Sequence, residues 1–276
     1  MNKTDFENKL LEFIRNSPDN CVQKNIAMRP DLESMYFFDE PLFGYASALD
    51  PYFEEAKKPG IIGPHFMTPA EWLPGAKTVF SAFLPYSSRV RSANSMNMDW
   101  PADEWLHARI EGQAFQNKIC RFAEELLQKE GFAAVTPLLD SRFKGTGIKN
   151  KDNAREEDFT SNWSERHVAY AAGLGTFGLS KGLITRKGVA GRFLSIISNI
   201  SLEPDKRPYT GVYDYCTFCG ACANNCPAKA ISIEGGKLHC PCSGFLDKVR
   251  EKRPPYYGCG KCQVKVPCED KAPGLK

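Results

Sequence analysis

The sequence predicts a domain of mixed helix and strand (α/β or α+β) over residues 1–205 and a small cysteine-rich domain over residues 206–276. In the first part, compact apolar runs alternate with segments of helical periodicity, which is the pattern of a mixed sheet-and-helix core. In the second part, nine of the chain's eleven cysteines follow residue 215. Because the cysteine motifs occupy the end of the chain, the preceding residues are expected to form a separate core.

Three helices are expected in the first domain. Thr4 and Glu7 form a capping-box pattern before apolar residues at helical spacing, so a helix is expected near the N-terminus. Residues 103–129 keep one apolar face through a long helix, which Gly131 ends. A shorter helix is expected over residues 163–172.

Apolar runs that are too short for helices predict the strands. The clearest is a buried strand over residues 78–84, with further strands expected over residues 133–139, 182–185 and 192–200 and a short hairpin over 230–238.

Two stretches lack this periodicity. Residues 28–76 are rich in proline, glycine and aromatic residues and are expected to be ordered but irregular. Residues 144–162 are polar and charged and are expected to form a mobile surface insertion.

Four cysteines stand in the order Cys216-x-x-Cys219-x-x-Cys222-x-x-x-Cys226-Pro227. This is the iron-sulfur run of bacterial ferredoxins, in which three closely spaced thiolates bind one cluster and the cysteine before proline binds a second. The spacing therefore predicts two clusters.

The other ligands are expected from the later cysteines, which are Cys240, Cys242, Cys259, Cys262 and Cys268. Two [4Fe-4S] clusters need eight thiolates, and this part of the chain has nine. In the crossed pattern, Cys268 completes the cluster of the first three cysteines. Cys226, Cys259 and Cys262 share the other cluster with Cys240 or Cys242, and the sequence leaves that choice open.

Disulfides and zinc are the alternative uses of such cysteines. A disulfide framework is typical of short secreted chains behind a signal peptide, whereas residues 1–5 contain no apolar run. Zinc sites use Cys-x-x-Cys pairs, but a third cysteine at the same spacing and a Cys-Pro ending are not zinc-ribbon features. Both alternatives are disfavoured.

Composition sets limits on location and partners. Hydrophobic residues make up 42% of the chain and charged residues 25%, and no apolar run is long enough to cross a bilayer. Reduced thiolates and oxygen-sensitive clusters predict a cytoplasmic protein without a membrane partner. The formal net charge of +3 does not indicate a general nucleic-acid-binding surface.

Gly173, Gly175 and Gly178 match the spacing of a dinucleotide-binding loop. That loop needs a strand before it and a helix after it, and the order here is reversed, which argues against a dinucleotide. The glycines are expected to let the backbone approach a bulky ligand closely. An ordinary turn at the C-terminus of a helix is the alternative.

Residues 164–178 resemble the helix and glycine loop of epoxyqueuosine reductases, whose relatives, the reductive dehalogenases, share the layout. Residues 73–79 and 257–263 resemble that family's first core strand and second cysteine group. The likeness covers most of residues 70–270. It implies a cobalamin-binding domain of nitroreductase-like fold, followed by a ferredoxin-like domain whose two [4Fe-4S] clusters pass electrons to cobalt.

The resemblance also implies roles for particular residues. In the family the glycine loop packs around the corrinoid, which implies cofactor contacts by Gly173, Gly175, Thr176, Phe177 and Gly178. The family's long helix presents polar residues to the corrinoid, so His107 and Arg109 are further cofactor candidates. For Arg109, an ion pair along the helix with Glu104 or Glu111 is the alternative.

The chain also departs from the family. Its members usually carry an aspartate proton donor shortly before the Glu-Arg of the helix, where this chain has Phe159 and Thr160. Asp140 is therefore the first candidate for the proton donor and Asp158 the second, with a solvated surface carboxylate as the alternative for both.

Two further departures lie near the end of the sequence. The last cysteine follows Pro267 instead of preceding a proline. The sequence given ends shortly after Cys268, without the helical repeat domain of family members that act on tRNA, so tRNA is a disfavoured partner.

Three isolated residues are expected to pack. His167 could ligate cobalt, but packing is the favoured interpretation for a lone histidine. Cys21 and Cys120 lie apart from the other cysteines and are expected to fill space as small apolar groups.

Two functions of different classes follow. The first is an iron-sulfur oxidoreductase that takes electrons from an external donor, a ferredoxin or flavodoxin, and passes them through both clusters to a corrinoid that reduces a small-molecule substrate. The second is a non-catalytic electron carrier or activating protein. A corrinoid absorption spectrum distinguishes the two, and a bound flavin would instead indicate a nitroreductase-like flavoprotein.

Overall fold

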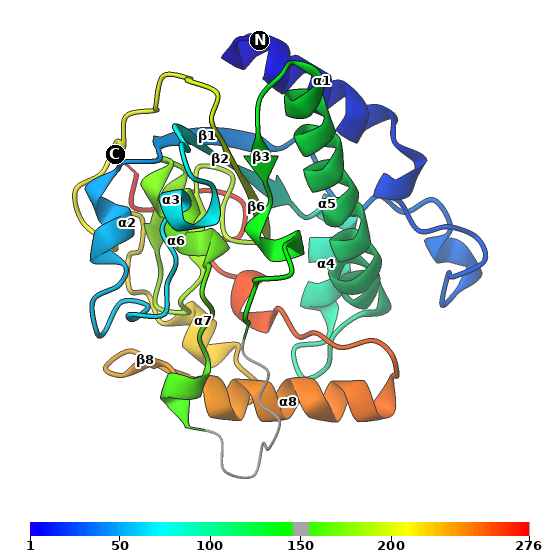
Figure 1. The fold of residues 1–276 in the computed structure, drawn as a ribbon. Helices are drawn as coiled ribbons and strands as arrows, with labels where there is room; N and C mark the ends of the chain where they lie inside the picture. Colours follow the sequence, from blue (N-terminus) through cyan, green and yellow to red (C-terminus); the bar gives the residue numbers. More distant parts are fainter. Residues whose placement is uncertain (146–154, 276) are drawn as a thin grey trace.

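A four-stranded antiparallel sheet forms the centre of the first domain in the computed structural model, which describes residues 1–145 and 155–275 (Figure 1). Its strands lie in the order β1 (Leu42–Ser47), β2 (Thr78–Pro85), β6 (Gly191–Ser198) and β3 (Ala134–Val135). Each neighbouring pair is antiparallel. The predicted mixed fold is confirmed, in its α+β form.

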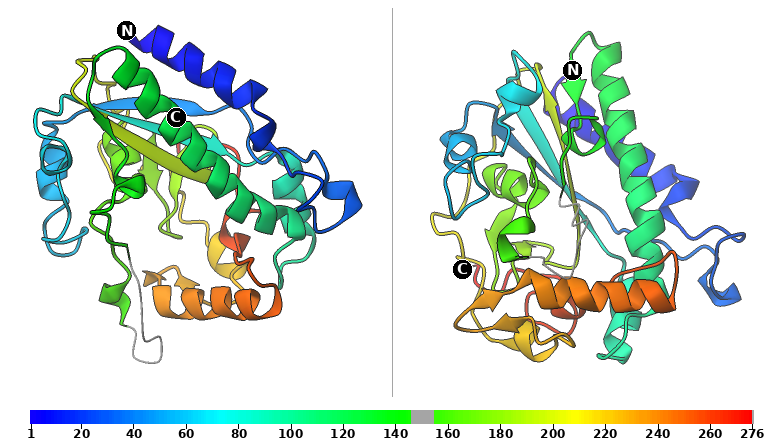
Figure 2. Two further views of the ribbon diagram at one scale, coloured as in Figure 1. Left: turned by 45° about the vertical axis from the view of Figure 1, so that its right-hand side comes forward. Right: turned by 60° about the horizontal axis from the view of Figure 1, so that its bottom comes forward.

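Helices cover both faces of this sheet (Figure 2). α1 (Lys3–Asn16) and α5 (Asp103–Lys129) pack on one face, and α6 (Glu165–Ala171) packs on the other. Because successive strand residues point to opposite faces, Ile196 joins the core beneath α5, whereas Ile197 joins the core beneath α6. Burial from both sides explains why every residue of β2 is buried.

The other elements are short, apart from one helix. The short helices are α2 (Pro51–Glu55), α3 (Pro69–Trp72), α4 (Ser88–Met96) and α7 (Ala221–Asn224), and the longer one is α8 (His239–Lys252). Two small antiparallel hairpins are formed by β4 (Gly175–Phe177) with β5 (Leu183–Thr185) and by β7 (Ile231–Ser232) with β8 (Gly236–Lys237). α8 runs along the lower edge of the molecule, beneath the sheet (Figure 1).

Several sequence expectations are confirmed closely. α5 has the predicted bounds, and β2 and β6 lie where their apolar runs predict strands. The hairpin β7–β8 lies within the expected residues 230–238. The helix expected over 163–172 is α6, which begins two residues later. The division of the chain near residue 205 stays a prediction.

Other expectations were wrong. α1 is capped by Asn2, whose side chain accepts a hydrogen bond of 2.9 Å from the Asp5 N–H, so Thr4 is not the N-cap. The segment 28–76 is not irregular throughout, because it contains β1. The strand expected over 133–139 is short, because Pro137 begins a 3-10 turn. Of the expected insertion, residues 146–154 lie outside the described residues.

Candidate functional site

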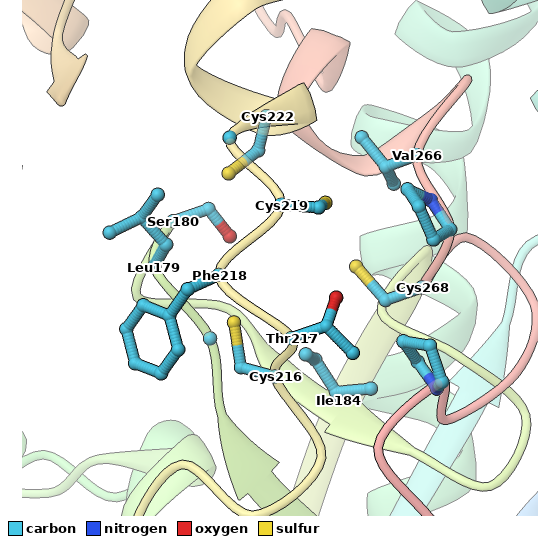
Figure 3. A pocket seen from close by; sticks show the side chains of 14 residues that line it. Leu179, Ser180, Ile184, Cys216, Thr217, Phe218, Cys219, Cys222, Val266 and Cys268 are labelled. Carbon is cyan, nitrogen blue, oxygen red and sulfur yellow. The ribbon is translucent and has the colours of Figure 1, made fainter. Parts of the chain in front are cut away.

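The first three cysteines and the last one line a common pocket (Figure 3). They are Cys216, Cys219, Cys222 and Cys268. In Figure 3 the sulfur atoms of Cys216, Cys222 and Cys268 point toward the same space. Apolar and small polar residues complete the wall, and no charged side chain of the described residues lines this pocket. We call it the first pocket.

A second pocket is lined by four other cysteines, namely Cys226, Cys242, Cys259 and Cys262. Its cavity is about 190 Å³, compared with about 20 Å³ for the first pocket. A small apolar cluster that includes Leu179 and Ile231 packs against cysteines of both pockets, so the two pockets share a wall. Among the described residues, no three His, Cys, Asp or Glu side chains converge closely enough to bind a single metal ion.

Glycines turn the chain within both cysteine groups. Gly220, with φ 75°, lies directly after Cys219 and precedes the single-turn helix α7 that carries Cys222. Gly260, with φ 69°, lies directly after Cys259 and precedes the 3-10 turn that carries Cys262. A left-handed backbone conformation costs glycine little, so the chain can reverse between ligands and bring their thiols to one side.

The structure distinguishes Cys240 from Cys242. Both lie in the first turn of α8, but only Cys242 lines the second pocket. The N–H groups of His239 and Cys240 donate to the carboxylate of Glu156, at 2.7 and 2.8 Å. Burial opposes ionisation of this carboxylate, but the two backbone donors lower the pKa of Glu156 to about 2. Glu156 therefore anchors the start of α8 as an anion.

Burial has the largest effect on the pKa values of the pocket thiols. It raises the pKa of Cys222 to about 11 and the pKa values of Cys259 and Cys268 to about 12, and neighbouring thiols add to each rise. Without a metal these thiols are protonated near neutral pH. A bound metal must displace their protons, which is the usual chemistry of thiolate ligands.

Cations line the second pocket. Arg109, on α5, donates to the Tyr257 hydroxyl at 2.8 Å, and its guanidinium lies 4.6 Å from the centre of the Tyr257 ring. Arg192, at the start of β6, donates to the amide oxygens of Gln113 and Gln116. Lys237 also lines the pocket. The alternative for Arg109, an ion pair with Glu104 or Glu111, is not what the structure shows, because Arg109 bonds to Tyr257 instead.

A buried lysine fixes the second cysteine group to α4. Lys261 is fully buried and donates to the backbone and side-chain oxygens of Asn94, at 2.6 and 2.7 Å. The Asn94 amide in turn donates to the carbonyl of Cys259 at 2.9 Å. Burial lowers the pKa of Lys261 to about 8. No local pattern predicts this contact, because Asn94 and Lys261 are 167 residues apart.

The first turn of α6 carries two unusual side chains. Both carboxyl oxygens of Glu165 are buried without a hydrogen-bond partner, and burial raises the pKa of Glu165 to about 8 despite the nearby Ser195 hydroxyl. Arg166 is exposed, and its guanidinium donates to the Lys181 carbonyl at 2.6 Å, while surrounding protein desolvates it and lowers its pKa. The Cys262 thiol is close enough to oppose the fall in the pKa of Arg166, so Arg166 lies near the second pocket.

The glycine loop makes its contacts within the chain. Gly173, with φ 79°, follows α6 as a helix C-terminal glycine. A Cβ atom at Gly175 would lie 2.0 Å from the Ile184 carbonyl oxygen, so pairing of β4 with β5 explains this glycine without a ligand. The buried Thr176 hydroxyl accepts from the Tyr215 N–H at 2.9 Å, and Phe177 packs on the His167 ring.

The remaining sequence candidates lie away from the pockets. His107 is fully buried, and its ring nitrogens contact the Met28 N–H and the Glu111 carboxylate, at 3.1 and 3.0 Å. Asp140 forms an ion pair of 2.8 Å with Arg142, which lowers the pKa of Asp140. An aspartate held as an anion is a poor proton donor near neutral pH, so the geometry does not favour Asp140 in that role.

The other isolated residues behave as space-filling or surface groups. Cys120 is completely buried in the core beneath α5. Cys21 is half-buried, and its thiol contacts the Pro18 carbonyl. Asp158 accepts from the Arg155 N–H at 2.9 Å on the surface. His167 packs against Phe177 with the two rings tilted by 49°, and it contacts the Ser164 hydroxyl at 2.8 Å.

Comparisons with known proteins agree with this arrangement. The 4Fe-4S binding domain family matches residues 209–232, which contain the first cysteine group. An epoxyqueuosine reductase of Bacillus cereus is 26% identical over 71% of this chain and 49% of its own length. A tetrachloroethene reductive dehalogenase of Desulfitobacterium hafniense is 43% identical over 24% of this chain and 12% of its own length.

Solved structures show the same fold. The epoxyqueuosine reductase of Bacillus subtilis matches with a TM-score of 0.53 and 19% identity, over 99% of this chain and 68% of that one. A catabolic reductive dehalogenase matches with a TM-score of 0.52 and 16% identity, over 84% of this chain and 30% of that one.

The predicted resemblance is therefore confirmed: the chain is similar to epoxyqueuosine reductases in sequence and fold, and residues 209–232 match the 4Fe-4S binding domain family. Its relatives are oxidoreductase enzymes. The chain spans about half the length of the curated epoxyqueuosine reductases that it matches, and a smaller share of the dehalogenases. In the described part of the chain, no helix is long and apolar enough to span a membrane.

Proposed function

We propose that this chain binds two [4Fe-4S] clusters and uses them to reduce a small molecule through a bound corrinoid. The two pockets carry the proposal, because each is lined by four cysteines in the crossed order that the motif predicts. The cysteines of the first pocket bind one cluster, and those of the second pocket bind the other. Cys242 is the eighth ligand, and Cys240 is the spare cysteine.

Iron content tests this ligand set. Anaerobically reconstituted protein should contain about eight iron atoms per chain, since each cubane takes four. Cys242→Ser should lower the content to about four, because it removes a ligand of the second pocket. Cys240→Ser is the matched control on the same helix turn and should leave the content unchanged. The reverse result for these two variants would contradict the assignment.

The side chains in the first turn of α6 fit the donor and acceptor groups of a corrinoid. A corrinoid carries amide side chains and a phosphodiester on its periphery. Arg166 offers a guanidinium donor for a phosphodiester, and the unpartnered carboxyl of Glu165 offers a partner for an amide. When bound, the corrinoid supplies reduced cobalt, which reduces carbon centres that no side chain can reduce. The chain's own residues hold the cofactor beside the second pocket.

An absorption spectrum after anaerobic incubation with cobalamin tests this part. Arg166→Gln should weaken cobalamin binding while the iron content stays at the wild-type value. Arg121→Gln, at an exposed position of α5, is the control and should bind as the wild type does. No corrinoid binding by the reduced protein would overturn the corrinoid part and leave an electron carrier as the better account, whereas a bound flavin would indicate a nitroreductase-like flavoprotein.

The substrate in this proposal is a small molecule rather than tRNA. An external ferredoxin or flavodoxin donates the electrons, and the protein acts in the cytoplasm. One solved structure of an epoxyqueuosine reductase contains a tRNA-Tyr stem loop, so tRNA is the competing substrate. The sequence has a basic run at Lys248, Arg250, Lys252 and Arg253, at the end of α8 and directly after it. Two of its members are engaged within the chain, because Arg253 pairs with Asp103 at 2.9 Å and Lys252 lies 5.0 Å from the Trp100 ring centre. These contacts favour a structural role for the run.

The assay for tRNA is reduction of epoxyqueuosine in tRNA by the cobalamin-loaded protein with a strong reductant. We expect no turnover. Turnover that is lost in the Lys252→Glu and Arg253→Glu variants would make tRNA the substrate.

A further inference from the structure

The two pockets differ in the charge around them. The first pocket is lined by no charged side chain of the described residues. The second is lined by Arg109, Arg192 and Lys237. A [4Fe-4S] cluster with four thiolate ligands is an anion, and its negative charge grows by one when it accepts an electron. Fixed cations beside a cluster therefore stabilise its reduced form, which raises its reduction potential.

The two arginines of the second pocket have no anionic partner among the described residues. Arg109 donates to the Tyr257 hydroxyl, and Arg192 donates to two glutamine amides, while neither forms an ion pair. Desolvation, together with the nearby Arg192, lowers the pKa of Arg109. Glu165 is the carboxyl near Arg192, and burial raises its pKa to about 8, so it is protonated near neutral pH. Two cations held close together without a counter-ion leave a net positive charge in the pocket wall. An anion in the pocket would offset that charge.

Solvent access, in contrast, favours a higher reduction potential for the first cluster. Cys219 is exposed and Phe218 is 44% exposed, so water reaches the edge of the first pocket, whereas none of the cysteines of the second pocket is exposed. Water screens a charge at the surface, but fixed cations in a protein interior interact through a lower effective dielectric. The two arginines are therefore expected to outweigh the difference in exposure.

We infer that Arg109 and Arg192 are positioning residues that hold the second cluster at a higher reduction potential than the first, so that electrons move from the first cluster to the second. This inference rests on the proposed two-cluster function. An external one-electron donor, of the ferredoxin or flavodoxin class, reduces the first cluster and is itself oxidised. The first cluster then returns to its oxidised form as the second is reduced by the same electron. No proton or further reactant is needed for this transfer.

An anaerobic redox titration of the reconstituted full chain, followed by electron paramagnetic resonance, tests the inference. Cys268→Ser identifies the signal of the first cluster, because that signal should be lost with the cluster. Arg109→Gln and Arg192→Gln should each lower the reduction equilibrium constant of the second cluster at least tenfold, which is about 59 mV for one electron. The potential of the first cluster should stay within a few millivolts of the wild type. Arg121→Gln, on the same helix as Arg109 but exposed, should change neither potential.

Conservative variants separate charge from packing. Arg109→Lys keeps the charge but loses the planar group that stacks on Tyr257, so the second cluster should keep most of its potential. A potential that falls as far in Arg109→Lys as in Arg109→Gln would overturn the inference, as would a wild type whose first cluster has the higher potential. A protein with only about four iron atoms would instead contradict the two-cluster proposal, which the iron determination detects separately.

Discussion

The first cysteine group, residues 216–226, and the second, residues 259–268, are built into the molecule in different ways. The first group packs Cys216 and Cys222 against an apolar core cluster and leaves Thr217, Phe218 and Cys219 exposed on its edge. The second group is fixed to the first domain. Trp105 of α5 lies against Gly260, and Asn94 of α4 binds both Lys261 and the Cys259 carbonyl.

This difference shows which information comes from the motif and which from the rest of the chain. The spacing of the cysteines determines which thiols can share a pocket. The surroundings of each pocket depend on residues far away in sequence, such as Arg109 and Arg192. Two similar motifs can therefore provide two different electrostatic environments within one small domain.

The largest expected effect comes from comparing the glycines of the two groups. Gly260→Ala would put a Cβ atom 1.9 Å from the Trp105 ring in addition to the left-handed backbone, and we expect a loss of about 3 kcal/mol or more. Gly220→Ala has a similar backbone, but its Cβ would meet only the end of the Ile233 side chain at 3.1 Å. We expect a loss of about 1 kcal/mol there.

Thermal unfolding of the anaerobic holoprotein measures the loss of stability in both variants, since each kcal/mol lowers the Tm by about 2 to 4 °C. Equal shifts for the two variants would mean that the second group is not fixed to α5 as described.

Glu165 predicts a pH dependence of stability. Its pKa is about 8 in the folded chain, against a usual value of 4.5, so between these values the folded state binds the proton more tightly than the unfolded state does. Stability should therefore fall as the pH rises through this window, by at most about 1.4 kcal/mol per pH unit. Glu165→Gln should remove this slope, while Glu251→Gln, at an exposed position, should keep it. An unchanged slope in Glu165→Gln would contradict the burial of a neutral carboxyl.

The smallest effect is expected at Asp140, which is remote from both pockets. Asp140→Asn removes an ion pair with Arg142 near the surface, and such pairs contribute about 0 to 1 kcal/mol. Urea unfolding should detect a change of that size at most, and the iron content should not change. Lost turnover in a variant with normal stability and normal iron would restore Asp140 as the proton donor.

Local patterns predicted the regular elements well, because their signals are local. The bounds of α5 follow from one apolar face kept over many turns, and β2 follows from an apolar run that ends at Pro85. β1 was missed because prolines and glycines surround it, and its pairing with β2 is a long-range contact. α8 was not predicted, because Cys240 and Cys242 in its first turn were interpreted only as cluster ligands. Pro241 between them is compatible with a helix, since a proline is tolerated in the first turn.

The cysteine motif predicted the grouping that the pockets display, but it could not choose between Cys240 and Cys242. That choice depends on the side of α8 that faces the pocket and on Glu156, which lies more than eighty residues earlier in the chain. The glycine loop was expected to contact a cofactor. The structure gives another reason for Gly175, because the Ile184 backbone approaches too closely for a side chain at that position. Spacing alone cannot tell whether a ligand or the chain itself fills the space next to a glycine.

Paired cysteine substitutions test the central account, the crossed sharing of two clusters, most directly. Iron is determined in anaerobically reconstituted protein carrying Cys216→Ser with Cys268→Ser, and in protein carrying Cys262→Ser with Cys268→Ser. The first pair draws both changes from one pocket, so about four iron atoms should remain, as for either single variant. The second pair draws one change from each pocket, so almost no iron should remain. Loss of all iron from the first pair, with about four atoms kept by the second, would contradict the crossed arrangement.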